Sequence, residues 1–533
     1  MKPDVSAIDP IDLNLATRLC FGDALTRLAQ TFPERLAVID GDVELSYGEL
    51  DCRTDALARG LVDFVDYQQP VAIMLRNSWQ FLTTFFACAK TGRVAVPITL
   101  LLSDIEVAHV LSECGATTII ADQEFLPRLE KILSEASLVE RVIVIGAMHA
   151  DEAAGIPIIA YDDVLKKNGG PVEMYVDDRD IVRCLFTSGT TSGTKGVLTS
   201  HAAVHVAALS TALCLDHRRW SPSVQPIVLP LFHCAAQDSA AFPTMLTGGT
   251  LILFRAFDAG EILNTIQDRG ATHVLLLPDM WRQMLAEQET HPRDVSSLRL
   301  CHYAMTPMPA NRMLGLRVNF PNANVLLGFG QTEFTPPTTF QWAEHQVTKS
   351  DSVGLPVVTT DVRIMGEDGS LKGPGVTGEI VYRGPQALSG YLNDPAATAA
   401  VFAHGWFHSG DLGQIDEDRV IWFVDRLKDV VKSGGENVSS LEVERTLLGH
   451  ADVADCAVIG MVDEKWGEVV TAFVIRRKES AVSAEELREF AGKTLARFKI
   501  PKAVVFVDSL PRTTTGKIRK TVLRESFSDV ATH

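Results

Sequence analysis

The chain has 533 residues, of which 46% are hydrophobic and 22% are charged, a balance typical of soluble globular proteins. This length exceeds that of one typical hydrophobic core, so we expect two or more domains. The formal net charge of −18 argues against nonspecific nucleic-acid binding, which needs a basic surface.

The first residues, MKPDVSAIDPIDLNLA, carry acidic side chains and no apolar core, so we expect no signal peptide. No apolar stretch approaches the length of a membrane span, and we expect no integral membrane segment. The nine cysteines form no CxxC pair and no metal-ligand spacing, which is typical of reduced, buried thiols in a cytoplasmic protein.

Short β-like runs alternate with helical patterns along the first four hundred residues. In chain order we predict a helix at 50–64, strands at 71–75, 117–121, 141–145, 181–186, 227–229 and 250–254, a helix at 259–268, and strands at 273–277 and 324–327. Between 354 and 381 the pattern changes to short strands with Gly and Pro turns, including GEDGSLKGPG, which indicates a small antiparallel sheet or barrel.

The last hundred residues have a different character. We predict a helix at 441–448, strands at 453–459 and 469–475, a helix at 484–498, and a strand at 504–506. The fold class is therefore α/β: a large N-terminal domain of layered α/β subdomains plus a small antiparallel barrel, followed by a small α+β C-terminal domain.

The segment 185–196, LFTSGTTSGTKG, is the most informative part of the chain. Its hydroxyls, glycines and the ammonium group of Lys195 follow an apolar strand and are suited to surrounding a polyphosphate. It is not a Walker A loop, because the GxxxxGK[ST] spacing is missing. A flexible Ser/Gly linker is the alternative, but a linker needs no lysine and does not lie between two apolar segments.

Four further blocks follow in order: GFGQTE at 328–333, WFHSGDLG at 406–413, VDRLKDVVKSGGENVSSLEVE at 424–444, and PRTTTGKIRK at 511–520. With the phosphate loop, these blocks resemble the adenylate-forming superfamily of acyl-CoA synthetases, luciferases and peptide-synthetase adenylation domains. The resemblance extends over most of the chain, and is nearest to bacterial fatty acyl-CoA ligases with some features of carnitine-CoA ligase. It implies a mobile C-terminal lid and the boundaries 1–425 for the adenylation domain, 426–428 for the hinge and 429–533 for the lid.

The resemblance also implies the nucleotide and metal ligands. Thr187 and Glu333 would hold Mg²⁺, which prefers oxygen ligands, and Lys517 in the PRTTTGK loop would be the catalytic cation at the α-phosphate. Asp411 would accept hydrogen bonds from the ribose, and Arg426 would contact ribose or phosphate. The remaining implied ATP and AMP ligands are Ser188, Gly189, Thr190, Thr191, Lys195, Ala304, Gly328, Phe329, Gly330, Gln331 and Thr332.

For the second half-reaction, the resemblance implies that the small domain rotates about Lys428. The rotation would bring Lys432 and the loop Ser433, Gly434, Gly435 and Glu436 to the active site, where glycines admit the narrow pantetheine arm of CoA.

His233 in LPLFHCAA matches a histidine that lines, and can gate, the acyl site of acyl- and aryl-CoA ligases. No acid stands in FHCAA, and this lowers the probability of an amino-acid substrate. The other predicted pocket residues are Gln237, Trp281, Met305, Phe329 and Phe334, although Trp281 is equally a core candidate. Met305 replaces smaller residues of many relatives and favours a short or compact acid.

The expected function is that of an ATP-dependent carboxylic acid–CoA ligase, with ATP, Mg²⁺ and CoA as cofactor and co-substrates, and a small-molecule acid that is fatty, branched, aryl or small and polar. The alternatives are an acyl-AMP ligase that loads a separate carrier protein, a luciferase-like monooxygenase, and a non-enzymatic binding module. No carrier domain with a GxDS motif is evident in the sequence. Monomer and homodimer remain equally open.

Overall fold

The computed structural model describes residues 5–135, 138–147, 151–187, 194–304, 308, 310–463, 466–512 and 518–527. The described chain forms two compact units, which are treated separately below. The first combines the residues up to Thr187 with 194–361 and 383–403, and the second combines 362–382 with 404 onward. This division differs from the predicted 1–425, 426–428 and 429–533 boundaries, because strands before the hinge group with the C-terminal part.

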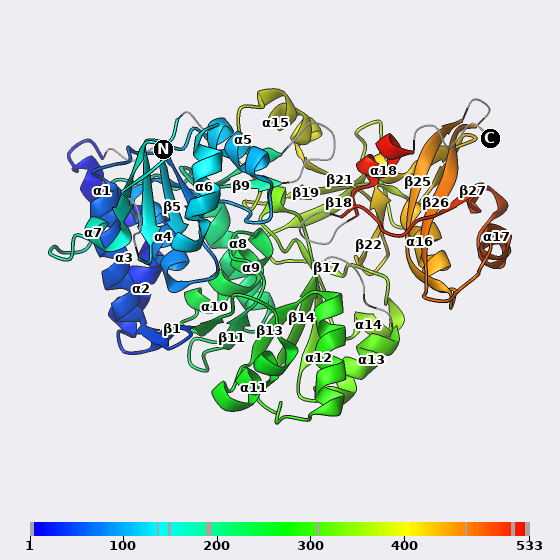
Figure 1. The fold of residues 1–533 in the computed structure, drawn as a ribbon, viewed down its shortest axis with the longest axis horizontal. Helices are drawn as coiled ribbons and strands as arrows, with labels where there is room; N and C mark the ends of the chain where they lie inside the picture. The colour runs from blue at the N-terminus through cyan, green and yellow to red at the C-terminus, as the bar shows by residue number, and fades with distance from the viewer. Residues whose placement is uncertain are drawn as a thin grey trace. The chain divides into compact units, whose positions relative to one another are not determined.

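The first unit contains a nine-stranded sheet whose central strands are parallel (Figure 1). Its order is β20 (Gly390–Tyr391), β10 (Lys195–Ser200), β9 (Ile181–Thr187), β4 (Val94–Pro97), β3 (Pro70–Met74), β5 (Thr118–Asp122), β6 (Arg141–Ile145), β8 (Ile156–Ala160) and β7 (Glu152–Ala153). Alternate residues of β3 enter different cores: Val71 and Ile73 pack in one cluster, and Ala72 and Met74 in the other. Burial on both faces is typical of parallel strands covered by helices.

Two smaller sheets complete the first unit. The four-stranded sheet runs β11 (Val224–Ile227), β12 (Thr250–Leu253), β1 (Leu36–Asp40), β2 (Val43–Ser46). The five-stranded sheet runs β13 (His273–Leu276), β14 (Leu300–Ala304), β15 (Asn324–Phe329), β16 (Thr339–Gln341), β17 (Leu355–Pro356), with its first three strands parallel.

Helices cover these sheets, and α5 and α6 lie side by side in Figure 1. The α-helices of the first unit are α1 (Pro10–Thr17), α2 (Asp23–Thr31), α3 (Tyr47–Leu61), α4 (Trp79–Thr91), α5 (Asp104–Cys114), α6 (Leu126–Leu133), α7 (Tyr161–Val164), α8 (His201–Cys214), α9 (Cys234–Ala236), α10 (Phe242–Leu246), α11 (Ala259–Arg269), α12 (Pro278–Thr290), α13 (Ala310–Asn319), α14 (His345–Thr348) and α15 (Pro395–Val401). A π-helical turn, η2 (Gln237–Ala241), separates α9 from α10. The helix α3 begins at a capping box formed by Ser46 and Glu49.

The second unit contains two sheets. One has the order β18 (Asp361–Met365), β19 (Gly378–Arg383), β21 (Phe407–Ile415), β22 (Ile421–Arg426). The other has the order β24 (Glu436–Val438), β23 (Val431–Ser433), β26 (Gly467–Arg476), β25 (Val453–Asp463), with β27 (Ala503–Phe506) parallel to β26. Its α-helices are α16 (Ser440–Leu448), α17 (Ala484–Gly492) and α18 (Lys520–Ser526).

The predicted α/β architecture is confirmed, with three differences. Over the described residues the four-stranded sheet of the second unit runs from β18 to β22 as an open sheet, so the expected barrel is not closed. The helix predicted at 484–498 ends at Gly492, and a short 3₁₀ turn, η6 (Arg497–Lys499), follows. The strand expected at 227–229 lies at 224–227, and it includes Pro226, a residue found in sheets mainly on edge strands such as this one.

Candidate active site

In the sequence, the predicted phosphate loop lies between β9 and β10, which belong to the first unit. The two strands pair antiparallel, and Thr187 faces Lys195 in their register. The predicted ligands Ser188, Gly189, Thr190 and Thr191 lie outside the described residues. The strand pair therefore positions Thr187 and Lys195 where the loop leaves the sheet and returns to it.

Two residues that the sequence analysis did not single out surround the ammonium group of Lys195. Its Nζ lies 3.2 Å from a carboxylate oxygen of Asp394 and 5.0 Å from the centre of the Tyr391 ring. Tyr391 belongs to β20, which pairs with β10, and Asp394 caps α15. No sequence motif indicates these contacts, because nearly two hundred residues separate Lys195 from Asp394.

Glu333 occupies the same neighbourhood, on the short 3₁₀ turn η3 (Thr332–Phe334) that follows β15. Its carbonyl oxygen accepts a hydrogen bond of 2.9 Å from Leu388 N–H, which fixes the turn. Burial raises the pKa of Tyr391, and the charges of Glu333 and Asp394 raise it further. The Glu333 carboxylate is therefore close enough to raise the pKa of Tyr391, whose ring also contacts Lys195.

Gly328, at the end of β15, is a glycine because the space beside it is filled. A Cβ atom there would lie 2.5 Å from His302 Nε2 and 3.2 Å from Phe340 Cε1. Gly328 faces Ala304 of β14 in the parallel register, so the two predicted nucleotide residues are neighbours. The side chains of His302 and Phe340 thus pack directly against the backbone of the GFGQTE motif at Gly328.

Three histidines, His217, His273 and His302, are buried in this part of the first unit. The rings of His217 and His273 stack at 4.4 Å, and neither ring nitrogen of His302 has a hydrogen-bond partner among the described residues. Burial lowers the pKa of all three, to about 4 for His273 and about 3 for His302.

Because these three histidines are buried, we expect the folded protein to lose stability in acid. Each folded-state pKa lies below the ordinary value of 6.5, so the unfolded chain binds more protons between these values. The free energy of unfolding is therefore expected to fall as the pH drops from about 6.5 towards 4, by up to about 1.4 kcal/mol per pH unit for each histidine. Urea unfolding at pH 7 and pH 5 measures this. His302→Leu should reduce the pH dependence, and the exposed His291→Leu should not; equal slopes for all three proteins would contradict the prediction.

His233 and Cys234 lie beside the GFGQTE motif. Cys234 Sγ is 3.2 Å from Thr332 Oγ1, and the His233 ring contacts Phe232 with centroids 4.8 Å apart. Burial lowers the pKa of His233 to about 4, so its imidazole is neutral near pH 7. A neutral imidazole can donate one hydrogen bond from its protonated nitrogen and accept one at the other nitrogen.

The remaining predicted pocket residues are mostly buried. Gln237, Trp281 and Phe334 are each 0% exposed, and Phe329 is 9% exposed. Trp281 donates a hydrogen bond of 3.0 Å to the carbonyl of His302 and packs against Phe320, an arrangement that favours its core alternative. Met305 lies outside the described residues, so the pocket volume that it controls stays a prediction.

In the second unit, Asp411 and Arg426 face each other across β21 and β22. Arg426 Nε lies 2.8 Å from Asp411 Oδ1, and the Asp411 side chain is only 2% exposed. The two predicted ribose ligands are thus brought together as an ion pair. The attraction between the opposite charges favours this placement of the two side chains.

The predicted hinge and CoA loop follow directly. Lys428 lies in the middle of a 3₁₀ turn, η5 (Leu427–Asp429), and its carbonyl accepts a hydrogen bond of 3.3 Å from Arg524 of α18. Lys432 is exposed on β23, and the β23–β24 hairpin turns at Gly434 and Gly435, whose φ angles are +62° and +86°. Two positive φ values favour glycine at both positions. Ser433 is buried and Glu436 is exposed, and Lys517 lies outside the described residues.

A family model described as AMP-binding enzyme matches residues 25–392, and another described as AMP-binding enzyme C-terminal domain matches residues 442–517. The chain belongs to the AMP-binding enzyme family. All the described motif residues of the first unit lie inside the first match.

Individual members of the AMP-binding enzyme family resemble the chain over nearly its whole length. Feruloyl-CoA synthase of an Amycolatopsis species is 36% identical over 507 residues, which are 94% of this chain and 98% of the relative. Long-chain-fatty-acid–CoA ligase FadD13 of Mycobacterium tuberculosis is 34% identical over 489 residues, 91% and 94% of the two chains. The structure of o-succinylbenzoate CoA synthetase of Bacillus subtilis, in complex with the acyl-adenylate intermediate OSB-AMP, has a TM-score of 0.81 at 28% identity, and the match covers 95% and 98% of the chains.

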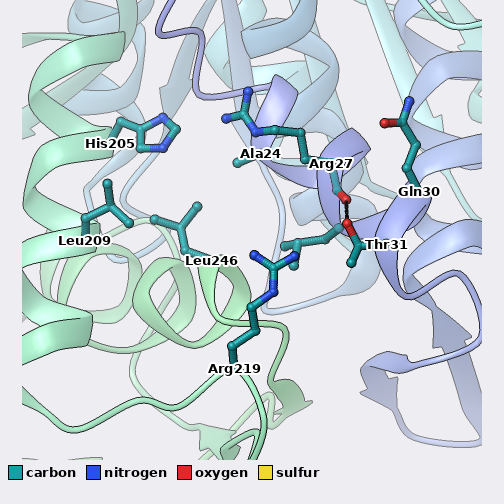
Figure 2. A pocket seen from close by; sticks show the side chains of 9 residues that line it. Ala24, Arg27, Gln30, Thr31, His205, Leu209, Arg219 and Leu246 are labelled. Carbon is teal, nitrogen blue, oxygen red and sulfur yellow. Dashed lines mark hydrogen bonds between the residues drawn. The ribbon is translucent and has the colours of Figure 1, made fainter.

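A hollow in the first unit lies between α2 and α8 and is lined by none of these motif residues (Figure 2). Its volume is about 310 Å³, and its lining includes Arg27, His205, Leu209 and Arg219. None of these residues belongs to a motif block of the AMP-binding enzyme family.

Within the described ranges, no helix is long and apolar enough to span a membrane.

Proposed function

We propose that this chain is an ATP-dependent carboxylic acid–CoA ligase that forms an acyl-adenylate and pyrophosphate and then transfers the acyl group to CoA. The observation that carries the proposal is the cluster in the first unit: Lys195, the Glu333 carboxylate, and the His233–Cys234 segment that contacts Thr332. Lys195 and Glu333 both neighbour Tyr391, and Cys234 links the His233 segment to Thr332, the residue before Glu333. Membership of the AMP-binding enzyme family supplies the reaction class.

The residues fit Mg²⁺. The hydroxyl of Thr187 and the carboxylate of Glu333 are hard oxygen ligands of the kind Mg²⁺ prefers, and both side chains are partly exposed to solvent. The ion, when bound, offsets negative charge on the phosphates of ATP. Lys195, the first residue of β10, adds a positive charge on a flexible stem, and both members of its ion pair with Asp394 are partly exposed.

For the adenosine part, we assign Asp411 to the ribose hydroxyls and Arg426 to ribose or phosphate. Their pairing across β21 and β22 supports this, because it brings the two predicted ribose ligands side by side on one sheet. We retain the boundaries 1–425, 426–428 and 429–533, with rotation of the C-terminal part about Lys428 between the two half-reactions.

The acid is left open between fatty, branched, aryl and small polar acids. The relatives are named for feruloyl and long-chain fatty substrates, two different classes. The His233 imidazole is neutral near pH 7, so it offers no negative charge to a cationic substrate group. This favours an acyl group that carries no positive charge near His233.

Pyrophosphate release from ATP and Mg²⁺, measured across a panel of carboxylic acids with and without CoA, tests the proposal. We expect acid-dependent release that turns over only when CoA is present. Release that CoA does not affect would favour the alternative, loading of a separate carrier protein. Silence with every acid would contradict the ligase assignment.

A further inference from the structure

A completely buried ion pair crosses the interior of the first unit next to the proposed active site. Arg183 and Asp238 are both 0% exposed. Arg183 donates from its two terminal nitrogens to the two carboxylate oxygens of Asp238, at 2.8 and 2.7 Å. Two parallel hydrogen bonds of this kind fix the direction of both side chains.

Gln237 shares the same guanidinium group. Its Oε1 accepts a hydrogen bond of 2.6 Å from the Arg183 nitrogen that also binds Asp238, and its Nε2 donates to the carbonyl of Leu231 at 2.6 Å. Consecutive side chains of a regular helix point in different directions, but Gln237 and Asp238 start the π-helical turn η2. Such wide turns are frequently found at functional sites.

The two ends of this network lie on the two halves of the proposed site. Arg183 belongs to β9, the strand that ends at Thr187 before the phosphate loop. Gln237 and Asp238 directly follow α9, which begins after His233, and Cys234 of α9 contacts Thr332 of the GFGQTE motif. The network therefore joins the strand of the phosphate loop to the segment that carries the acyl-site histidine.

Stability alone gives little reason for this pair. Removing two charges from water is costly, and replacing a buried ion pair by apolar side chains of similar size is often neutral or stabilising. Arg183 Nε is buried without a hydrogen-bond partner among the described residues, so the guanidinium group is not fully satisfied. The pair instead fixes geometry, because two parallel hydrogen bonds between a guanidinium group and a carboxylate tolerate little displacement of either side chain.

We propose that Arg183 is a positioning residue: through Asp238 and Gln237 it sets the His233–Cys234 segment relative to the phosphate-loop strand, and thereby aligns the acid with the nucleotide. This inference rests on the proposed ligase function and adds a determinant of acid binding to it. Arg183 contacts no substrate itself.

The test uses the full-length protein with Arg183→Met/Asp238→Leu, which removes both charges and leaves neither partner buried alone. We expect it to fold and to keep its KM for ATP. Its kcat/KM for the best acid in the pyrophosphate assay should fall about tenfold or more, as small misplacements of reacting groups do. Its preference between two acids of different length should also change. Lys90→Met/Asp51→Leu/Asp55→Leu is the control, since Lys90 of α4 pairs with both Asp51 and Asp55 of α3 in another buried ion cluster of the first unit; it should change neither value.

Arg183→Lys is the second variant, because it keeps the charge, loses the fork and does not depend on the double variant folding. It should show the same selective fall in kcat/KM for the acid. Wild-type values for the acid in both Arg183 variants would overturn the inference, as would an equal loss for ATP and acid. An active wild type with unaffected variants rejects only this inference, whereas a wild type without acid-dependent release rejects the proposed function and the inference with it.

Discussion

Replacing Lys517 by alanine is expected to reduce acid-dependent pyrophosphate release by about 10²–10³-fold and to leave thioester formation from supplied acyl-AMP unchanged. The reason is the charge that develops when the carboxylate attacks the α-phosphorus and pyrophosphate leaves. An ammonium group on a flexible stem can stabilise that charge in the transition state and then withdraw. The prediction rests on the PRTTTGK motif, which the C-terminal family model includes up to residue 517.

Rapid-quench measurement of each half-reaction separates the two steps. Lys499→Ala is the matched control, since Lys499 lies in the same part of the chain and pairs with Glu442 at 2.7 Å. It should behave as wild type in both steps. Equal losses in adenylation and thioester formation for Lys517→Ala would show that the variant damages the fold or the shared nucleotide site.

Local sequence patterns predicted most of the elements that frame the site. The strand expected at 181–186 is β9 at Ile181–Thr187, and the expected strand at 324–327 extends to Phe329, at the start of the GFGQTE motif. These predictions were correct because buried parallel strands are short apolar runs that end at glycine and polar residues. The hairpin turn at Gly434 and Gly435 is equally local, and its positive φ values agree with the sequence.

The contacts that tune the site were not predictable in this way. Lys195 meets Asp394 from a separate segment, and Arg183 meets Asp238 across 55 positions. No periodicity or spacing encodes such pairs, since they arise only when several layers pack together. Trp281 illustrates the same limit. A tryptophan suits a pocket and a core equally, and the hydrogen bond from Trp281 to the His302 carbonyl favours the core.

Replacing Lys428 by proline is expected to spare adenylation and to slow thioester formation about tenfold or more. Lys428 lies within the 3₁₀ turn Leu427–Asp429, where φ values near −60° are usual. Proline fixes φ near −65°, so it suits the turn as described but opposes any rearrangement at this residue. The implied rotation between half-reactions needs such a rearrangement, and only the second step should suffer.

The contacts around the turn allow Lys428→Ala to serve as the control for Lys428→Pro. Arg524 donates to the Lys428 carbonyl and to Asp429 at 3.3 and 3.1 Å, and neither bond involves the lysine side chain. Lys428→Ala therefore keeps both bonds and the freedom of φ, and it should retain both half-reactions, which stopped-flow and quench measurements can compare. Wild-type rates for Lys428→Pro in both steps would remove Lys428 as the pivot. Loss of thioester formation in Lys428→Ala as well would assign the effect to the ammonium group rather than to the backbone.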